Sequence, residues 1–155
     1  MPSTPADRQA FRAELLRRQP RWYSPLLHLL FPSLFGVAVM VGCAAVIRDL
    51  RPLQLLTIPV VLVLSNMVEW RVHKYLLHRR APVLGLLYDR HTPEHHRVFV
   101  TEDMAIRSRR EFRLILIPFY GIVAVVALDV PFALAIWQLG QANVAALFLA
   151  TSAFY

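Results

Sequence analysis

Residues 26–47 read LLHLLFPSLFGVAVMVGCAAVI, and this stretch decides the fold. As a helix, it would span about 33 Å at 1.5 Å per residue, which matches a bilayer hydrocarbon core of about 30 Å. The stretch carries no Lys, Arg, Asp or Glu. It therefore predicts a transmembrane helix. His28 lies near its start, where a lone histidine is more often structural than a metal ligand.

The composition of the whole chain agrees with a membrane protein. Hydrophobic residues make up 57% of the 155 residues, and the mean hydropathy is +0.47. Both values exceed what a soluble domain of this size needs for a core. The net charge of +7 comes with no base-reading motif, so we expect no nucleic-acid partner. Cys43 is the only cysteine, and we expect it to be a small buried hydrophobe.

Two further apolar stretches complete the predicted bundle. Residues 53–68 form a short return crossing, and residues 114–155 are long enough for two more helices. The second stretch could turn at 129–131 or at 138–143. We expect both to lie near the far face, with the last helix starting around Asn143. The predicted fold is all-α, an integral membrane helical bundle of about four transmembrane helices.

The basic residues indicate how the bundle is oriented. Ten of the 17 Lys and Arg residues lie in 71–113, two lie in 48–52, and none follows Arg113. Cytoplasmic loops are enriched in Lys and Arg. We therefore expect the basic arm 1–24 and the region 71–113 to be cytoplasmic, within one multi-pass domain that covers residues 1–155.

The arm of residues 1–24 has the signals of a helix start. Thr4 can cap free backbone amides, a proline follows it, and Asp7 adds an acid at the positive end of the helix dipole. Both a short helix lying on the membrane and a loosely ordered basic arm fit this pattern. Trp22 and Tyr23 then follow, which are residues that favour the lipid headgroup layer.

Histidines cluster between the second and third apolar stretches. Imidazole is the commonest protein metal ligand and is mostly neutral near pH 7. The cluster therefore predicts a metal site at a membrane surface. Five of the six histidines in the chain belong to it, namely His73, His78, His91, His95 and His96.

The spacing of these histidines favours one group over the other. His73 and His78 would lie about 140° apart on an α-helix, too far for a shared face unless the helix frays or each binds a different metal. His91 and His95 lie one turn apart. Thr92 could cap a short helix that presents the later histidines from its first turn.

Nearby acids are candidates to accept the second ring N–H of a ligand histidine and so fix its tautomer. The other interpretation is that they are solvated charges of a polar loop. These acids are Asp89, Glu94, Glu102 and Asp103.

Together the motifs resemble a known family. An HxxxxH motif at 73–78 just past an apolar helix, followed by HxxxHH at 91–96, resembles the fatty acid hydroxylase/sterol desaturase superfamily. The phrases YDRHT at 88–92 and EHHRVF at 94–99 are similar to its bacterial members. The resemblance covers residues from about 53 onward. The pair of motifs is specific, whereas either motif alone is not.

The resemblance implies a membrane enzyme with a histidine-bound di-iron centre that oxidises a lipid C–H bond with O2. Neutral nitrogen ligands suit iron while keeping it oxidisable. The electron donor would be a separate protein, because the chain has no haem-binding HPGG stretch and no CxxC pair. The implied metal ligands are His73, His78, His91, His95 and His96.

The family carries further HxxxH and HxxHH motifs that do not occur in this sequence. Five imidazoles cannot fill two iron coordination spheres. We therefore expect this chain to be the front portion of a hydroxylase, which binds at most one ion tightly and oxidises no lipid by itself. The alternatives are a membrane zinc- or iron-binding protein without enzymatic activity and an inactive scaffold. The lipid class, and the choice between hydroxylation and desaturation, stay open.

Overall fold

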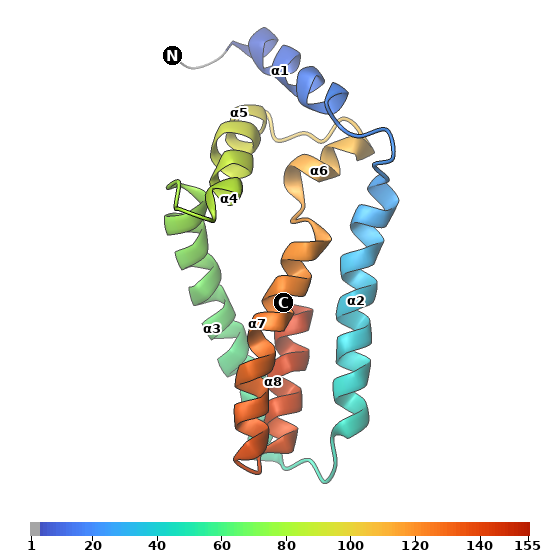
Figure 1. Cartoon of the computed structure of the whole chain (residues 1–155), viewed down its shortest axis with the longest axis vertical. Coiled ribbons are helices and arrows are strands. Elements are labelled where there is room, and N and C mark those ends of the chain that lie inside the picture. The colour runs from blue at the N-terminus through green and yellow to red at the C-terminus, as the bar shows by residue number, and fades with distance from the viewer. Residues whose placement is uncertain (1–3) are drawn as a thin grey trace. The chain divides into compact units, whose positions relative to one another are not determined.

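The computed structural model describes residues 4–155, apart from the side chain of Phe119, and its regular elements are helices. Within that range the only β contact is an isolated bridge between Val100 and Asp103. The all-α prediction is therefore confirmed (Figure 1). The elements are α1 (Pro5–Arg17), α2 (Pro25–Val46), η1 (Pro52–Leu56), α3 (Thr57–Val72), η2 (His73–Leu77), α4 (Gly85–Arg90), η3 (His91–His95), α5 (His96–Val98), η4 (Arg109–Glu111), α6 (Phe112–Ile115), α7 (Phe119–Gln138) and α8 (Ala142–Phe154).

The chain divides into two compact units. We call residues 4–28 together with 70–116 the histidine unit, and residues 29–69 together with 117–155 the membrane unit. The chain passes between them within α2, within α3 and just before α7.

Three segments are long and apolar enough to cross a membrane. They are Pro25–Val46, Pro52–Leu77 and Arg109–Gln138, with 22, 26 and 30 residues. The first matches the predicted crossing at 26–47. The second is longer than the predicted 53–68, because η1 precedes α3 and η2 continues it. Many of the large apolar side chains of these segments are exposed in the isolated chain, as expected of surfaces that face lipid. The length and apolar character of these segments therefore indicate a membrane protein.

Helices α7 and α8 form a hairpin through a turn at Gly140. This residue has a φ of 77°, in the left-handed region that glycine adopts without strain. The second of the two candidate turns, at 138–143, is therefore the one that the chain uses. Helix α8 begins at Ala142, one residue before the predicted Asn143, and has 13 residues. Whether it completes a fourth crossing stays a prediction.

The first candidate turn, at 129–131, was wrong. Asp129 and Pro131 both lie inside α7, and the Ser152 hydroxyl of α8 donates a hydrogen bond to the Asp129 carboxylate. A polar partner on a packed neighbouring helix lowers the cost of an acid within an apolar helix. The acid therefore does not need to lie at the membrane surface.

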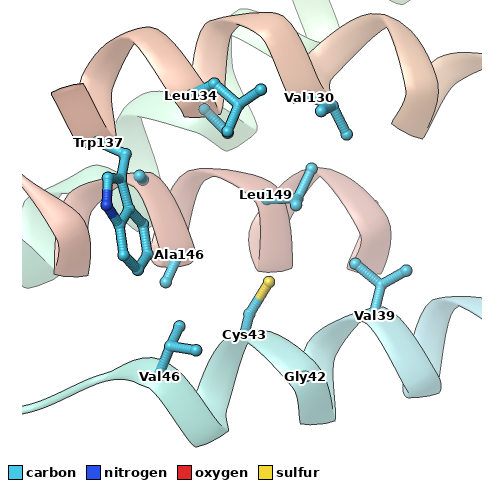
Figure 2. Close-up of a pocket in the computed structure, with 11 residues that line it drawn as sticks. Val39, Gly42, Cys43, Val46, Val130, Leu134, Trp137, Ala146 and Leu149 are labelled. Atoms are coloured by element: carbon cyan, nitrogen blue, oxygen red, sulfur yellow. The ribbon is translucent and has the colours of Figure 1, made fainter.

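The membrane unit contains an apolar cavity among α2, α7 and α8, with a volume of about 350 Å³. Figure 2 shows Cys43 on α2 and Trp137 on α7 among the side chains that line it. Cys43 is buried, as predicted from its place in an apolar stretch. The lining consists of Val39, Gly42, Cys43, Val46, Val130, Ala133, Leu134, Trp137, Ala145, Ala146 and Leu149.

In the histidine unit, α1 is a well-formed helix rather than a loose arm. The Thr4 hydroxyl accepts a hydrogen bond from the Asp7 backbone N–H at 3.2 Å, and the Asp7 carboxylate accepts one from the Thr4 N–H at 3.1 Å. This reciprocal capping box was the signal in the sequence. Leu15 of α1 then packs with Val98 and Phe99 in a small core.

A buried ion pair fastens α1 to the same core. The Arg12 side chain is 4% exposed and that of Glu111 is 1% exposed, and their charged atoms lie 3.2 Å apart. Arg12 also donates to the backbone carbonyls of Ala105 and Val98. The guanidinium thereby joins α1 to three points within residues 98–111, which are distant from α1 in the sequence.

Candidate metal centre

Each of the two histidine motifs contains a π-helical turn. Residues His73–Leu77 form η2, and residues His91–His95 form η3. In a π-helix the backbone hydrogen bonds run between residues five apart, so such residues lie one turn apart. The expectation that His73 and His78 point about 140° away from each other was therefore wrong, because it assumed an α-helix.

The π-turns bring the histidines together in two pairs. The Nε2 atoms of His73 and His78 lie 3.1 Å apart, and those of His91 and His96 also lie 3.1 Å apart. One potential ligand atom from each of the four histidines lies within 4.8 Å of the others. We call His73, His78, His91 and His96 the histidine cluster. The predicted one-turn partner of His91 was His95, whereas the structure pairs it with His96.

These separations fit a shared metal ion. Imidazole nitrogens bind Zn²⁺ at about 2.0–2.1 Å, so two ligand nitrogens 3.1 Å apart would subtend about 95° at a common ion. In a tetrahedral site every pair of such nitrogens lies about 3.3–3.4 Å apart, so the widest separation allowed by the 4.8 Å limit would need to close by about 1.4 Å on metal binding.

The lowered pKa values of two histidines in the cluster also favour the binding of a cation. Burial and, after it, the neighbouring imidazoles, led by that of His96, together lower the pKa of His91 to about 4. Burial and the other histidines likewise lower the pKa of His96. Both rings are therefore neutral near pH 7, which is the form that binds metals.

His95 lies outside the cluster, although its ring stacks on that of His91 with centroids 5.3 Å apart. Its Nδ1 lies 2.9 Å from the carbonyl oxygen of Leu114. A carbonyl can only accept a hydrogen bond, so Nδ1 carries a proton and Nε2 is the nitrogen left to bind a metal. This is the tautomer that metal-binding histidines commonly have. Its predicted role as a ligand stays a prediction.

Two contacts hold the motifs in register. The Thr92 hydroxyl donates to the backbone carbonyl of Leu77 at 2.7 Å, which joins η3 to the end of η2. Arg80 makes a bidentate ion pair with Asp89 across the connecting loop, with both N–O distances 3.0 Å. Thr92 was expected to cap a helix, but it lies inside the π-turn. In the sequence, the only signal for the contact with Leu77 was a hydroxyl residue next to His91.

The predicted acidic acceptors have other partners where the structure shows them. Asp89 pairs with Arg80, and Asp103 accepts hydrogen bonds from Arg107 at 3.0 and 3.2 Å. For Glu94 and Glu102 the predicted role stays a prediction. His28 is not part of the cluster, and its ring packs edge-on against Tyr23 with centroids 5.6 Å apart.

Comparison with known proteins identifies no relative. No family model matches the chain, and no curated protein or solved structure shows a similarity to it.

Proposed function

We propose that this protein is a membrane protein that binds a first-row transition-metal ion through His73, His78, His91 and His96. The observation that carries the proposal is the convergence of four imidazole nitrogens from two separate motifs within 4.8 Å. Neutral imidazoles suit iron, copper, nickel and zinc, and disfavour magnesium and calcium.

We further propose that the ion is iron and that the site serves the oxidation of lipid C–H bonds with O2. The HxxxxH and HxxxHH motifs support this, through their resemblance to the fatty acid hydroxylase/sterol desaturase superfamily. Iron bound there would supply the redox chemistry that an unactivated C–H bond requires. The chain itself supplies neutral nitrogen ligands and a membrane-embedded unit. A separate protein would deliver the electrons.

The membrane unit offers a place for hydrocarbon. Its cavity of about 350 Å³ is lined by apolar side chains and lies within the range of about 300–1,000 Å³ that is usual for ligand pockets. Such a lining accepts hydrocarbon. The basic residues at 71–113 favour a cytoplasmic location for the cluster.

A metal-binding protein without enzymatic activity is the second candidate. The number of clustered ligands favours it, because four imidazoles satisfy one ion, whereas a di-iron centre needs ligands for two. In this case the cluster would bind metal and the lipids of the cell would be unchanged.

Isotope labelling in the source organism separates the two candidates. The natural gene is edited to encode His91→Ala, or Lys74→Ala as a matched control on η2, and cells are grown under isotopically labelled O2. If the protein oxidises lipids, one or more labelled lipids should be absent from the His91→Ala cells and present in the Lys74→Ala cells. Identical labelled lipids in wild-type and His91→Ala cells would reject the oxidase and leave the metal-binding protein.

A further inference from the structure

Two arginine-rich segments of the histidine unit are joined by the side chain of Gln19. This side chain is buried, donates to the Arg110 backbone carbonyl at 2.9 Å and accepts from Arg110 Nε at 3.2 Å. Gln19 follows α1 by two residues, and Arg110 lies in η4. The end of α1 therefore lies beside the segment that leads into α6 (Figure 1).

The arginines at this junction lack negative partners. Arg21, Arg109, Arg110 and Arg113 make no ion pair with any residue that the structure describes. The nearest acid in the sequence, Glu111, is buried against Arg12 and cannot neutralise them.

By contrast, Arg17 and Arg18 both pair with Glu14. The four arginines of the junction have no such acidic partner among residues 4–155. We call Arg21, Arg109, Arg110 and Arg113 the arginine patch.

The neighbouring aromatic residues support this grouping. Burial raises the pKa of the Tyr23 phenol, and the positive charges of Arg113 and Arg110 oppose the rise. Both guanidiniums therefore act on the same phenol. Trp22 is 85% exposed, which is unusual for so large an apolar side chain in water but ordinary in a lipid headgroup layer.

Both segments of the patch adjoin a membrane span. Trp22 is three residues from the start of α2, and the apolar part of the Arg109–Gln138 span follows Arg113. Because both segments adjoin an apolar span in the sequence, we expect the arginines to lie at headgroup depth. The group of opposite charge that is available at this depth is the phosphate of an anionic lipid.

We propose that the arginine patch is a binding site for the phosphate group of an anionic phospholipid, with Trp22 seated in the same headgroup layer. The site is separate from the histidine cluster and does not depend on the proposed metal chemistry. Each basic residue near an anionic membrane surface strengthens association about fivefold, so four together give a marked preference for anionic over zwitterionic lipid.

The test measures lipid preference of the full chain in nanodiscs of phosphatidylcholine with a minor share of phosphatidylglycerol. Spin-labelled versions of the two lipids report their relative association with the protein. Wild type should prefer phosphatidylglycerol, and Arg109→Gln/Arg110→Gln should lower that preference at least fivefold. Arg17→Gln/Arg18→Gln removes two exposed arginines that already pair with Glu14 and should leave the preference within twofold of wild type.

A second variant separates the geometry of the patch from its charge. Gln19→Leu keeps every arginine but removes the hydrogen bonds that join the segments, so the lipid preference should fall while the helix content by circular dichroism is unchanged. Equal losses in both double variants, or no loss in Arg109→Gln/Arg110→Gln, would overturn the proposal. Displacement of the labelled lipid by millimolar inorganic phosphate or by an RNA oligonucleotide would also overturn it, because the occupant would then not be a lipid.

Discussion

The hydroxyl of Thr92 donates a hydrogen bond to the backbone carbonyl of Leu77 at 2.7 Å. Leu77 is the last residue of one π-turn, and Thr92 is the second residue of the other. The two residues are 15 positions apart, and this contact, together with the Arg80–Asp89 ion pair, holds the first pair of histidines against the second.

Thr92→Val should therefore weaken metal binding without removing a ligand. Valine keeps the shape of threonine but cannot donate, and loss of a supporting contact of this kind typically costs about 10–100-fold in metal affinity. Thr92→Ser keeps the hydroxyl and should bind like wild type. Competition with a chromophoric chelator measures the difference. Equal affinities for the valine variant and wild type would show that the contact does not organise the site.

His95 should not be needed to bind the ion held by the histidine cluster. Its Nδ1 is bonded to the Leu114 carbonyl, and it is not among the four clustered residues. His95→Ala should keep the dissociation constant of the ion within about tenfold of wild type, whereas His96→Ala should raise it much further because it removes a ligand. The same chelator competition gives both values. If His95→Ala loses as much affinity as His96→Ala, His95 is a ligand of the ion, contrary to this prediction.

Removing one member of the Arg12–Glu111 pair should lower the stability of the protein more than replacing both members with apolar residues. Both side chains are almost fully buried, so Glu111→Ala leaves Arg12 with Asp103, at 4.0 Å, as its remaining charged partner and should destabilise the histidine unit by about 3 kcal/mol. Arg12→Met/Glu111→Leu removes both charges and should recover part of that loss, because the Ala105 and Val98 carbonyls lose their donor. Thermal unfolding in detergent tests this. A double variant that is as unstable as the single one would contradict it.

Acid should release the contact that Asp103 makes with its basic neighbours. Hydrogen bonds from Arg107 hold the pKa of Asp103 below its ordinary value of 3.8, with help from Arg107 and Arg12 charges. Because the folded-state pKa is lowered, the stabilisation is present above pH 3.8 and is lost as the pH falls through the lower folded-state value. Wild type should unfold at a higher temperature than Asp103→Asn at pH 6, and this difference should shrink as the pH is lowered below 3.8. A difference that persists unchanged would exclude Asp103 as its source.

The membrane-spanning elements could be predicted from the sequence because length and apolar character are local properties. Residues 26–47 specify α2 almost to the residue. The turn at Gly140 was one of two alternatives, and what decided between them is a tertiary contact. Asp129 is stable inside α7 because Ser152 on α8 donates to it, and no local pattern reveals that partner.

The histidines were recognisable from the sequence, but their geometry was not. Angles calculated for an α-helix separated His73 from His78, whereas π-turns bring them to 3.1 Å. The repeated spacing was the available signal, since His91 and His96 are also five apart. The packing of α1 through Arg12 could not be predicted, because its partners lie about 90 positions away.

The central claim is that two π-turns build one metal site from four histidines, and the number of ions bound per chain tests it most directly. Purified protein is loaded with Fe²⁺ under anaerobic conditions, passed over a desalting column and measured by elemental analysis. Wild type, His28→Ala and Lys74→Ala should each hold one ion per chain, and His91→Ala/His96→Ala should hold none, because removing one pair leaves two ligands. Two ions per wild-type chain, or one ion retained in His91→Ala/His96→Ala, would contradict the account.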